Sequence, residues 1–396
     1  MKKLIILFLV NIAIFCNAQS IHLYNHNFPE VNYPDARVED MLNQVTDNQI
    51  ISDVEHLSSY LNRRADAIHI YNVKDWLISQ YESMNLDSVY LHDFQVIPFW
   101  STEPKPFTTA PNVLAMKRGK IYPNDFVICG AHYDSYVRAE GEFDPDTLVS
   151  PGADDNASGV AGILTTARIL RNYEFERSII FASWNAEEFG LCGSNEYAKA
   201  CRNDSVDIVA YFNLDMTGYV NPGNDIHINL LYINDDSLLG NFVKQVCNVY
   251  MPEIGIWQDW LPGGDTDYSS FNRNGYPAIS PSEDVNNLSP YIHSENDIIG
   301  LSVNSWDQSV VFTKLNLACV AHAAGIMPES INEIDENIEI ERYQVFDIFG
   351  RMVYDEKTLS TNIDEISVNN LQSGVYIVRF FVSGGNIITK KFFLKY

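Results

Sequence analysis

Residues 125–135 read DFVICGAHYDS, and this stretch decides the fold class. Its first five residues form an almost purely apolar run, which is typical of a short strand buried on both faces of a sheet. Helical patterns separate it from similar apolar runs at 178–183, 208–214, 226–233 and 278–280. Strands that alternate with helices indicate an α/β fold, and we expect a mixed, mostly parallel central sheet flanked by helices.

The second half of the stretch carries the first side chains that could do chemistry. His132 and Asp134 lie two residues apart, so in an extended chain they share one face of the strand. A carboxylate in that position can hydrogen-bond the imidazole and fix its tautomer, which a metal-bound histidine needs. The pattern therefore favours a metal site at the carboxyl end of this strand.

Further acids and a second histidine come after the strands or between them. They are Asp154 and Asp155 in GADDNASG at 152–159, the pair Glu187 and Glu188, then Asp215 and His293. The carboxyl ends of parallel strands open onto one crevice, so these side chains can meet there. Histidines and carboxylates without cysteine are typical of a two-metal hydrolytic centre. One glutamate of the adjacent pair would bind metal, and the other would handle the proton of a bridging water.

Each of these residues has a simpler explanation when it is taken alone. The acids at 154–155 could cap the following helix, and the glutamate pair could form a solvated turn. Asp215, which follows an apolar strand, could be an ordinary turn residue. Their joint occurrence favours a shared site.

These motifs, in this order, resemble those of the M28 zinc peptidases of the bacterial leucyl-aminopeptidase type, over residues 50–326. The resemblance rests on HYDS at 132–135, GADDNASG at 152–159, AEEFGL at 186–191, LDMT at 214–217, and YPA at 276–278 with His293 ahead of Asp297. It implies an α/β fold of the zinc-exopeptidase type.

The resemblance also implies two Zn²⁺ ions per chain and identifies the ligands of each ion. His132 and Asp215 would bind one zinc ion, and Asp155 would bridge it to the second. Glu188 and His293 would complete the second site.

Other residues take supporting roles by the same resemblance. Glu187 would act as the general base and then as the general acid. The peptide bond between Asp155 and Asn156 would be cis. We expect Asp134 and Asp297 to support the ligands from behind.

The sequence departs from the family near residue 268. Tyr268, in TDYSSF at 266–271, stands where relatives have a histidine, and the tyrosine that polarises the scissile carbonyl in known members has no clear match. We take Tyr291 and Tyr268 as candidates for the oxyanion donor. We expect Met216 to line the pocket for the substrate side chain.

Charge divides the chain into parts. Acidic residues outnumber basic ones by 52 to 26, yet after residue 337 the two kinds are equal in number. The acidic excess therefore belongs to the preceding part of the chain. We expect a signal peptide at 1–18, an N-terminal arm or pro-segment at 19–46, the zinc peptidase domain at 47–328, a linker at 329–337 and a small all-β, sandwich-like domain at 338–396.

The tail has the pattern of two β-hairpins, one around Gly350 and one around SGG at 383–385. It resembles the C-terminal sorting domain of type IX secretion in Bacteroidetes, through VFDIFGR at 345–351, LQSGVY at 371–376 and KK at 390–391. The resemblance implies that the secretion machinery takes the chain from the periplasm to the cell surface or the extracellular space. An ordinary β-sandwich module for adhesion is the alternative.

We therefore expect a secreted di-zinc aminopeptidase that acts on peptides with a free N-terminus. Three alternatives stay open: a single-zinc enzyme like the glutaminyl-peptide cyclotransferases, a carboxypeptidase that uses Arg138 or Arg273, and a non-catalytic binding module. The intact DNASG at 155–159 favours hydrolysis over cyclisation. The net charge of −26 disfavours nucleic acid and anionic membranes as partners. No stretch has the length for stable insertion in a membrane.

Loss of the signal peptide would leave five cysteines. Cys129, Cys247 and Cys319 lie in apolar segments, and we expect buried thiols there. Cys192 and Cys201 could form a disulfide in an exported protein or stay reduced.

Overall fold

The computed structural model describes residues 27–99, 107–139, 141–233, 236–262, 264–327, 340–347, 350–360, 371, 374–382 and 387–394. The chain divides into two compact units, Met1–Pro328 and Glu329–Tyr396. The expected signal peptide at 1–18, the start of the expected N-terminal arm and the expected linker at 329–337 lie outside the described residues.

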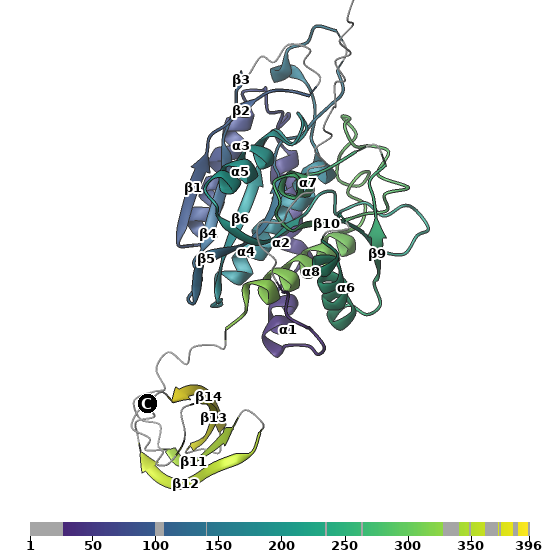
Figure 1. The fold of residues 1–396 in the computed structure, drawn as a ribbon. Coiled ribbons are helices and arrows are strands. Elements are labelled where there is room, and N and C mark those ends of the chain that lie inside the picture. Colours follow the sequence, from purple (N-terminus) through teal and green to yellow (C-terminus); the bar gives the residue numbers. More distant parts are fainter. Residues whose placement is uncertain are drawn as a thin grey trace, which may run out of the picture. The chain divides into compact units, whose positions relative to one another are not determined.

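The larger unit is built on one eight-stranded sheet (Figure 1). In spatial order its strands are β1 (Ser88–His92), β4 (Asn112–Lys117), β6 (Arg177–Trp184), β5 (Tyr122–His132), β7 (Asp207–Asn213), β10 (Ala278–Ser282), β8 (His227–Leu231) and β9 (Gly255–Asp259). The four central strands β6, β5, β7 and β10 are parallel. The β1–β4, β4–β6 and β10–β8 pairs are antiparallel, so the predicted mixed, mostly parallel sheet is confirmed. A short ribbon, β2 (Gln95–Val96) with β3 (Phe107–Thr108), stands apart from it.

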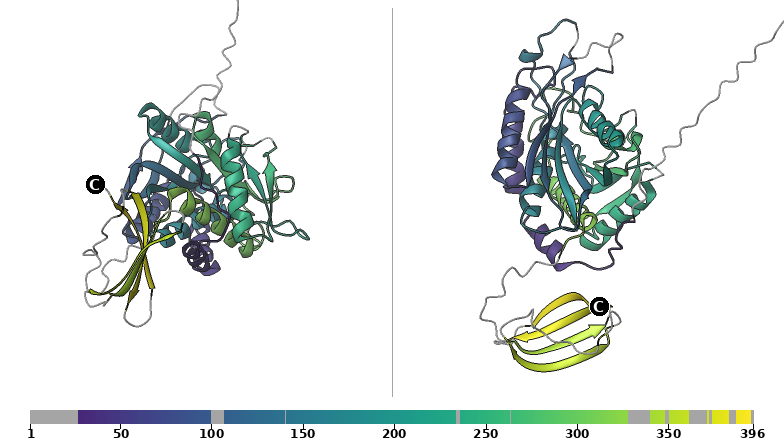
Figure 2. Two further views of the ribbon diagram at one scale, coloured as in Figure 1. Left: turned by 60° about the horizontal axis from the view of Figure 1, so that its bottom comes forward. Right: turned by 60° about the vertical axis from the view of Figure 1, so that its left-hand side comes forward.

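Helices cover both faces of this sheet (Figure 2). Along β5, Val127 and Cys129 belong to one buried cluster and Ile128 to another, as the alternation of a strand requires. The cluster of Ile128 includes residues of α5 (Cys192–Asn203) and α7 (Tyr268–Arg273). The larger cluster includes residues of α1 (Ala36–Asn43), α2 (Asp47–Ser58), α3 (Ile70–Ser83), α4 (Gly159–Leu170), α6 (Ser237–Tyr250) and α8 (Trp306–Ala324).

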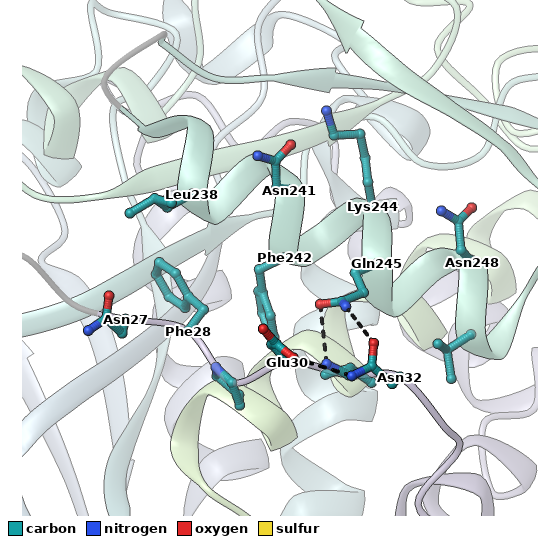
Figure 3. Close-up of a pocket in the computed structure, with 13 residues that line it drawn as sticks. Asn27, Phe28, Glu30, Asn32, Leu238, Asn241, Phe242, Lys244, Gln245 and Asn248 are labelled. Carbon is teal, nitrogen blue, oxygen red and sulfur yellow. Dashed lines mark hydrogen bonds between the residues drawn. The ribbon is translucent and has the colours of Figure 1, made fainter.

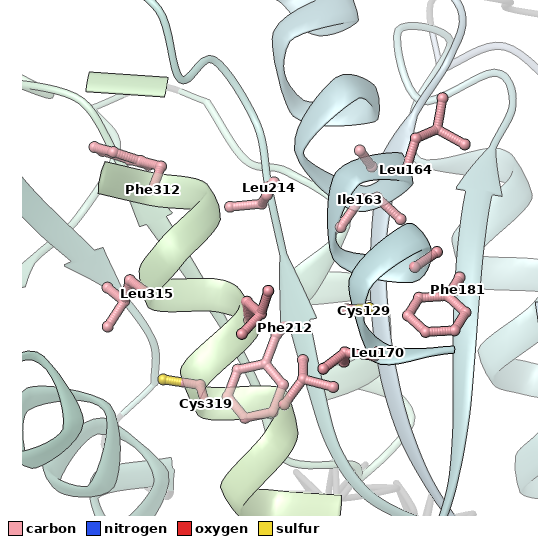
Figure 4. Close-up of a cluster of buried hydrophobic side chains, with 14 of the residues drawn as sticks. Cys129, Ile163, Leu164, Leu170, Phe181, Phe212, Leu214, Phe312, Leu315 and Cys319 are labelled. Carbon is pink, nitrogen blue, oxygen red and sulfur yellow. The ribbon is translucent and has the colours of Figure 1, made fainter. Parts of the chain in front are cut away.

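The contact of α4 with α8 sets the position of the chain just after β7 (Figure 4). Gly162 lies where a Cβ atom would stand 2.8 Å from Leu214 Cδ1 and 3.0 Å from Thr313 Oγ1 of α8. Only glycine allows α4 to approach both neighbours this closely. Leu214 immediately precedes Asp215, so the helix packing determines where Asp215 lies.

The segment before residue 47 holds a helix that the sequence analysis did not predict. Asp35 caps α1 by accepting the backbone N–H of Arg37, and Val38, Met41 and Leu42 are buried in the main core. From residue 27 onward the expected N-terminal arm is therefore packed on the body of the unit.

An open pocket lies beside this segment (Figure 3). Phe28 stacks on Phe242 of α6 with ring centroids 5.2 Å apart. The Gln245 side chain binds the same segment, accepting the Val31 N–H at 3.2 Å and donating to Asn32 Oδ1 at 3.3 Å. Residues 27–32 are thereby fastened to α6.

Cys192 and Cys201 are both free, so the possible disulfide is not formed. The two residues lie at opposite ends of α5, nine positions apart. A helix rises about 1.5 Å per residue, which separates their Cα atoms by about 13 Å, beyond the ~7 Å limit of a disulfide. Cys129, Cys247 and Cys319 are buried, as predicted.

The smaller unit is an antiparallel sheet, in the order β12 (Met352–Ser360), β11 (Ile340–Asp347), β13 (Gly374–Val382) and β14 (Ile387–Leu394). Both predicted hairpins, β11–β12 and β13–β14, are present, which confirms the all-β prediction. Its core contains Ile340, Tyr343, Val345, Tyr376, Val378, Phe380 and Val382. In the described parts of both units, no helix combines the length and apolarity that crossing a bilayer requires.

Candidate active site

The candidate site residues come from five segments at one edge of the sheet. His132 is the last residue of β5, Glu187 and Glu188 follow β6, and Asp215 follows β7. These three strands are parallel neighbours, so their carboxyl ends meet at the same edge. Asp155 comes from the kinked turn η2 (Ala153–Ser158) ahead of α4, and His293 from the loop between β10 and α8.

Asp155 lies between the two histidines. One oxygen, Oδ1, is 3.3 Å from His132 Nε2, and the other, Oδ2, is 3.1 Å from His293 Nε2. His132 Nε2 is also 3.4 Å from Asp215 Oδ1, and His293 Nε2 is 2.9 Å from Glu188 Oε2. A carboxylate that offers one oxygen to each side has the geometry of a bridging ligand.

The potential metal ligands form two groups of three. In each group the ligand atoms lie within 4.8 Å of one another, and the groups are His132, Glu187 and Asp215, and Asp155, Glu188 and His293. The structure therefore brings all five expected ligands together, with Glu187 beside them. His293 is the most exposed member, with 40% of its side chain accessible.

Asn156 ties the two ligand-bearing segments together. Its side chain donates to Leu214 O at 3.0 Å and accepts the N–H groups of Gly159 and Met216 at 3.0 and 3.3 Å. The peptide bond between Asp155 and Asn156 is cis, as the resemblance implies. Asn156 thus fixes the start of α4 against the chain around Asp215.

Asp134 supports the site in two ways. His132 Nδ1 lies 3.5 Å from Asp134 Oδ1 and 3.1 Å from the Asp134 carbonyl oxygen. The Asp134 carboxylate also accepts the backbone N–H groups of Glu187 at 3.1 Å and Glu188 at 3.3 Å. The first contact follows from the spacing in the sequence, whereas the second links β5 to the turn after β6.

Asp297 lies behind Asp155. It accepts the backbone N–H of Asp154 at 2.9 Å and that of Asp155 at 3.1 Å. Burial, with the charge of Asp155 close by, raises the pKa of Asp297 to about 6. Asp154 does not cap a helix with its side chain, since its carboxylate accepts the backbone N–H of Gly218 at 2.8 Å.

Backbone strain is concentrated at the same edge. Ala186, Met216 and His293 all have positive φ angles, of 59°, 51° and 55°. Such conformations cost non-glycine residues about 1–3 kcal/mol each and persist where the surroundings impose them. Each of the three is a candidate ligand or the direct neighbour of a site residue.

The electrostatics of the site favour bound cations. Burial raises the pKa of Glu187 well above its usual range, and the Glu188 and Asp215 carboxylates add to this against the opposing effect of His132. Burial and the neighbouring Asp155 raise the pKa of Glu188 to about 7. Burial alone would lower the pKa of His293, but Glu188 and Asp155 raise it to about 12. Carboxylates crowded in this way are unfavourable until positive charge joins them.

The residues present fit zinc. Glu188 Oε1 and Asp215 Oδ1 are buried and have no hydrogen-bond partner, so each keeps lone pairs for a cation. Imidazole nitrogens and carboxylate oxygens are normal zinc ligands. A set with two histidines and a shared carboxylate suits two ions better than one.

The remaining predicted residues have no described hydrogen bond to the candidate ligands. Tyr268 begins α7 and packs on the cluster of α5 and α7, where burial raises its pKa to about 12. Tyr291 is half-buried two residues before His293, and Met216 follows Asp215. Their expected roles in oxyanion and side-chain binding stay predictions.

Three contributors escaped the sequence analysis. The hydroxyl of Thr266 donates to Asp215 Oδ2. The Tyr136 ring packs edge-on to the His293 ring, with the ring centroids 5.4 Å apart. Asp267 is fully buried, and burial raises its pKa to about 7. Thr266 and Asp267 lie in TDYSSF at 266–271, the segment that departs from the family. Their position in this segment was the only feature of the sequence that could have marked them as site residues.

The chain is similar to known proteins in both of its units. The family model described as peptidase family M28 matches residues 112–317, and the secretion system C-terminal sorting domain matches 329–395. A probable leucine aminopeptidase of Arthroderma otae is 28% identical over 280 residues, which cover 69% of this chain and 72% of that protein. A probable aminopeptidase of Saccharomyces cerevisiae is 24% identical over 294 residues, which cover 71% of this chain and 74% of that protein.

A solved structure of the LapA aminopeptidase of Legionella pneumophila has a TM-score of 0.64 and 25% identity, covering 77% of this chain and 78% of that one. An aminopeptidase from Aneurinibacillus sp. shares the fold, with 17% identity and a TM-score of 0.59. The match covers 75% of this chain and 98% of that one. Because the family model spans about half of the chain and includes all five expected ligands together with Glu187, the protein belongs to peptidase family M28 and ends in a sorting domain.

Proposed function

We propose that this protein is a secreted di-zinc aminopeptidase that hydrolyses the first peptide bond of peptides with a free N-terminus. The observation that carries the proposal is the position of Asp155 between His132 and His293, with one oxygen toward each ring. Curated relatives with the name leucine aminopeptidase support the same activity.

In the proposed site, His132 with Asp215 and Glu188 with His293 would hold the two zinc ions, and Asp155 would serve both pairs. Zinc ions in such a site act as Lewis acids and lower the pKa of water toward ~7. Asp134 orients the His132 ring through its contacts with Nδ1. Asp297 holds the backbone of Asp155 in place.

Glu187 is the proposed proton carrier. It takes a proton from the water that attacks the carbonyl carbon, and it delivers that proton to the nitrogen as the C–N bond breaks. Burial and the neighbouring carboxylates raise its pKa, so it holds a proton more tightly than an ordinary glutamate does. The high density of negative charge would also attract the α-ammonium group of a peptide substrate.

Two alternative activities can be separated from this one. A single-zinc cyclotransferase needs only one of the two ligand groups, whereas both are assembled here. A carboxypeptidase needs a cation for the terminal carboxylate of its substrate. The backbone N–H of Arg138 donates to His293 O at 3.2 Å, so Arg138 lies beside the site. The carboxypeptidase alternative is therefore included in the test below.

The test is an assay of the purified full chain on three substrate types, with and without chelator. We expect release of the first residue from unblocked peptides, no cleavage of N-blocked ones, loss of activity with chelator, and two zinc ions per chain by elemental analysis. Cyclisation of N-terminal glutamine without hydrolysis, or cleavage of N-blocked peptides from the carboxyl end, would refute the proposal.

The sorting domain supports export through the type IX machinery, with the signal peptide serving the first membrane. Removal of residues 338–396 tests this part. We expect the shortened chain to stay in the periplasm with its zinc site intact. Arrival of the shortened chain outside the cell at the normal level would contradict the proposed route.

A further inference from the structure

Arg63 is a fully buried cation, and all the described acceptors of its guanidinium are backbone carbonyls. Its Nε donates to Tyr133 O at 2.9 Å, and its Nη2 donates to Gly152 O at 2.8 Å. Its Nη1 donates to Leu57 O at 3.1 Å and to Pro151 O. A buried guanidinium without a hydrogen-bonded carboxylate is unusual, because burial of a charge is costly unless other contacts offset it.

The acceptors belong to the segments that carry metal ligands. Tyr133 stands between His132 and Asp134, and Gly152 stands three residues before Asp155. One planar guanidinium therefore sets the distance between the end of β5 and the turn η2. Its rigid fork of donors suits it to this task in a way that a lysine ammonium would not.

Two further features adapt the site to Arg63. Gly152 has a φ of 55°, and a Cβ atom there would stand 2.8 Å from Arg63 Nη2, so a side chain would displace the guanidinium. Ser135 adds a second fastening, since its Oγ accepts the Arg63 N–H at 3.0 Å and donates to Ser150 O at 2.9 Å. Gly152 thus leaves room for the guanidinium beside η2, and Ser135 holds the end of β5 to Arg63 and to Ser150.

The charge of Arg63 also acts on the site. Burial lowers the pKa of Arg63 to about 10, while the charges of Asp297, Asp134, Asp155 and Glu188 oppose the shift, so the group is a cation at neutral pH. A fixed cation near two zinc ions repels them, which on its own would weaken zinc binding. The hydrogen bonds have the opposite effect, because they hold the ligands in place before the metal arrives.

We propose that Arg63 is a positioning residue of the metal centre, which clamps the His132 and Asp155 segments together and thereby tightens zinc binding despite its positive charge. This inference rests on the proposed di-zinc function. It assigns Arg63 to the assembly of the site and not to contact with substrate.

The sign of the change in zinc affinity tests the clamp. In Arg63→Met, competition against a chromophoric chelator should show zinc bound about 10–100-fold more weakly, the range known for partners behind metal ligands. Arg63→Lys keeps the charge but has fewer donors, so its zinc affinity should be intermediate. Unchanged or tighter zinc binding in Arg63→Met would overturn the proposal.

A matched control separates positioning from general stability. Arg168 pairs with Asp53 and donates to Gln80 at 3.0 Å, away from the ligands. Arg168→Met should lower the unfolding temperature of the protein while its zinc dissociation constants stay at the wild-type values. An equal loss of zinc affinity in Arg168→Met would show that any destabilisation loosens the metal, and it would remove the special role of Arg63.

If Arg63→Met does not fold, Ser135→Ala decides the question. It retains the charge of Arg63 and removes the second fastening, so we expect a several-fold loss of zinc affinity in a folded protein. An unchanged affinity there would contradict the clamp. A wild-type chain that binds fewer than two zinc ions would instead contradict the proposed function, so the two failures are distinguishable.

Discussion

The carboxylate of Asp134 accepts the backbone N–H of Glu187 at 3.1 Å, which joins the end of β5 to the turn after β6. The position of the proposed proton carrier is thus set by the residue that also contacts the His132 ring. Removal of the Asp134 charge should therefore affect both metal binding and catalysis, although Asp134 touches neither metal nor substrate in the proposed mechanism.

Asp134→Asn tests this coupling. The amide keeps one acceptor oxygen but turns its NH₂ group toward a backbone N–H, so the glutamate turn should shift. We expect zinc affinity to fall about 10–100-fold and kcat to fall even at saturating zinc. Chelator competition and steady-state kinetics measure the two effects. A fall in zinc affinity alone, with full kcat at saturating zinc, would show that Asp134 does not position Glu187.

Glu187→Gln should fold, retain zinc and lose about 10²–10⁴-fold in kcat, because the amide cannot accept the proton of the attacking water. Zinc content and kcat are measured on the same preparation. Glu196→Gln is the matched control, since Glu196 lies on α5 with 41% of its side chain exposed and should leave kcat unchanged. Wild-type turnover in Glu187→Gln would exclude Glu187 as the proton carrier.

Asp155→Asn should reduce bound zinc below two ions per chain, because an amide offers one oxygen where the bridge needs two. Elemental analysis of dialysed protein gives the stoichiometry. Asp154→Asn is the adjacent control, since its amide oxygen can still accept the Gly218 N–H, and it should keep both ions. The reverse outcome, with zinc lost only in Asp154→Asn, would identify Asp154 as the bridge.

The candidate ligands could be named from the sequence because each one stands in a recognisable motif, and all but His293 lie beside an apolar strand or a helix start. The central strands were equally predictable, since burial on both faces leaves continuous apolar runs such as 178–183. Helix α1 was missed because it is only eight residues long and buries a single i, i+3, i+4 set, Val38, Met41 and Leu42. One short set does not stand out from the polar residues around it.

The supporting contacts could not be predicted in the same way. Asp297 was expected only through the family resemblance, and Arg63 was not expected at all, since it binds backbone groups of segments far along the chain, at Tyr133 and Gly152. Every residue has the same backbone groups, so such partners leave no spacing or residue type in the sequence. Only the folded arrangement of β5 and η2 reveals them.

The metal-free protein should lose stability as the pH rises from about 4 to 7, and Asp267 should contribute to this. Burial raises the pKa of Asp267 from 3.8 to about 7, so over that range the folded chain keeps a proton that the unfolded chain releases. Stability therefore falls with increasing pH through this window. Asp267→Asn removes the cost of ionisation, so it should raise the unfolding temperature relative to wild type at pH 8 and not at pH 4.

Thermal unfolding of chelator-treated protein at both pH values measures this difference. Asp225→Asn, at an exposed position before β8, should show the same small effect at pH 4 and pH 8. A gain in Asp267→Asn that is equal at the two pH values would mean that the ionisation of Asp267 does not cause it.

Gly152→Ala should destroy zinc binding, while Gly223→Ala should not. Both glycines have positive φ, at 55° and 92°, so alanine carries a backbone cost of about 1–3 kcal/mol in each. A Cβ at residue 152 would stand 2.5 Å from Asp155 O and 2.6 Å from Ser135 Cβ, whereas nothing lies within 4 Å of one at residue 223. The difference between the variants therefore isolates the contacts around Asp155, and zinc stoichiometry with unfolding temperature measures it. Equal zinc content in the two variants would show that the turn η2 can shift without loss of the metal centre.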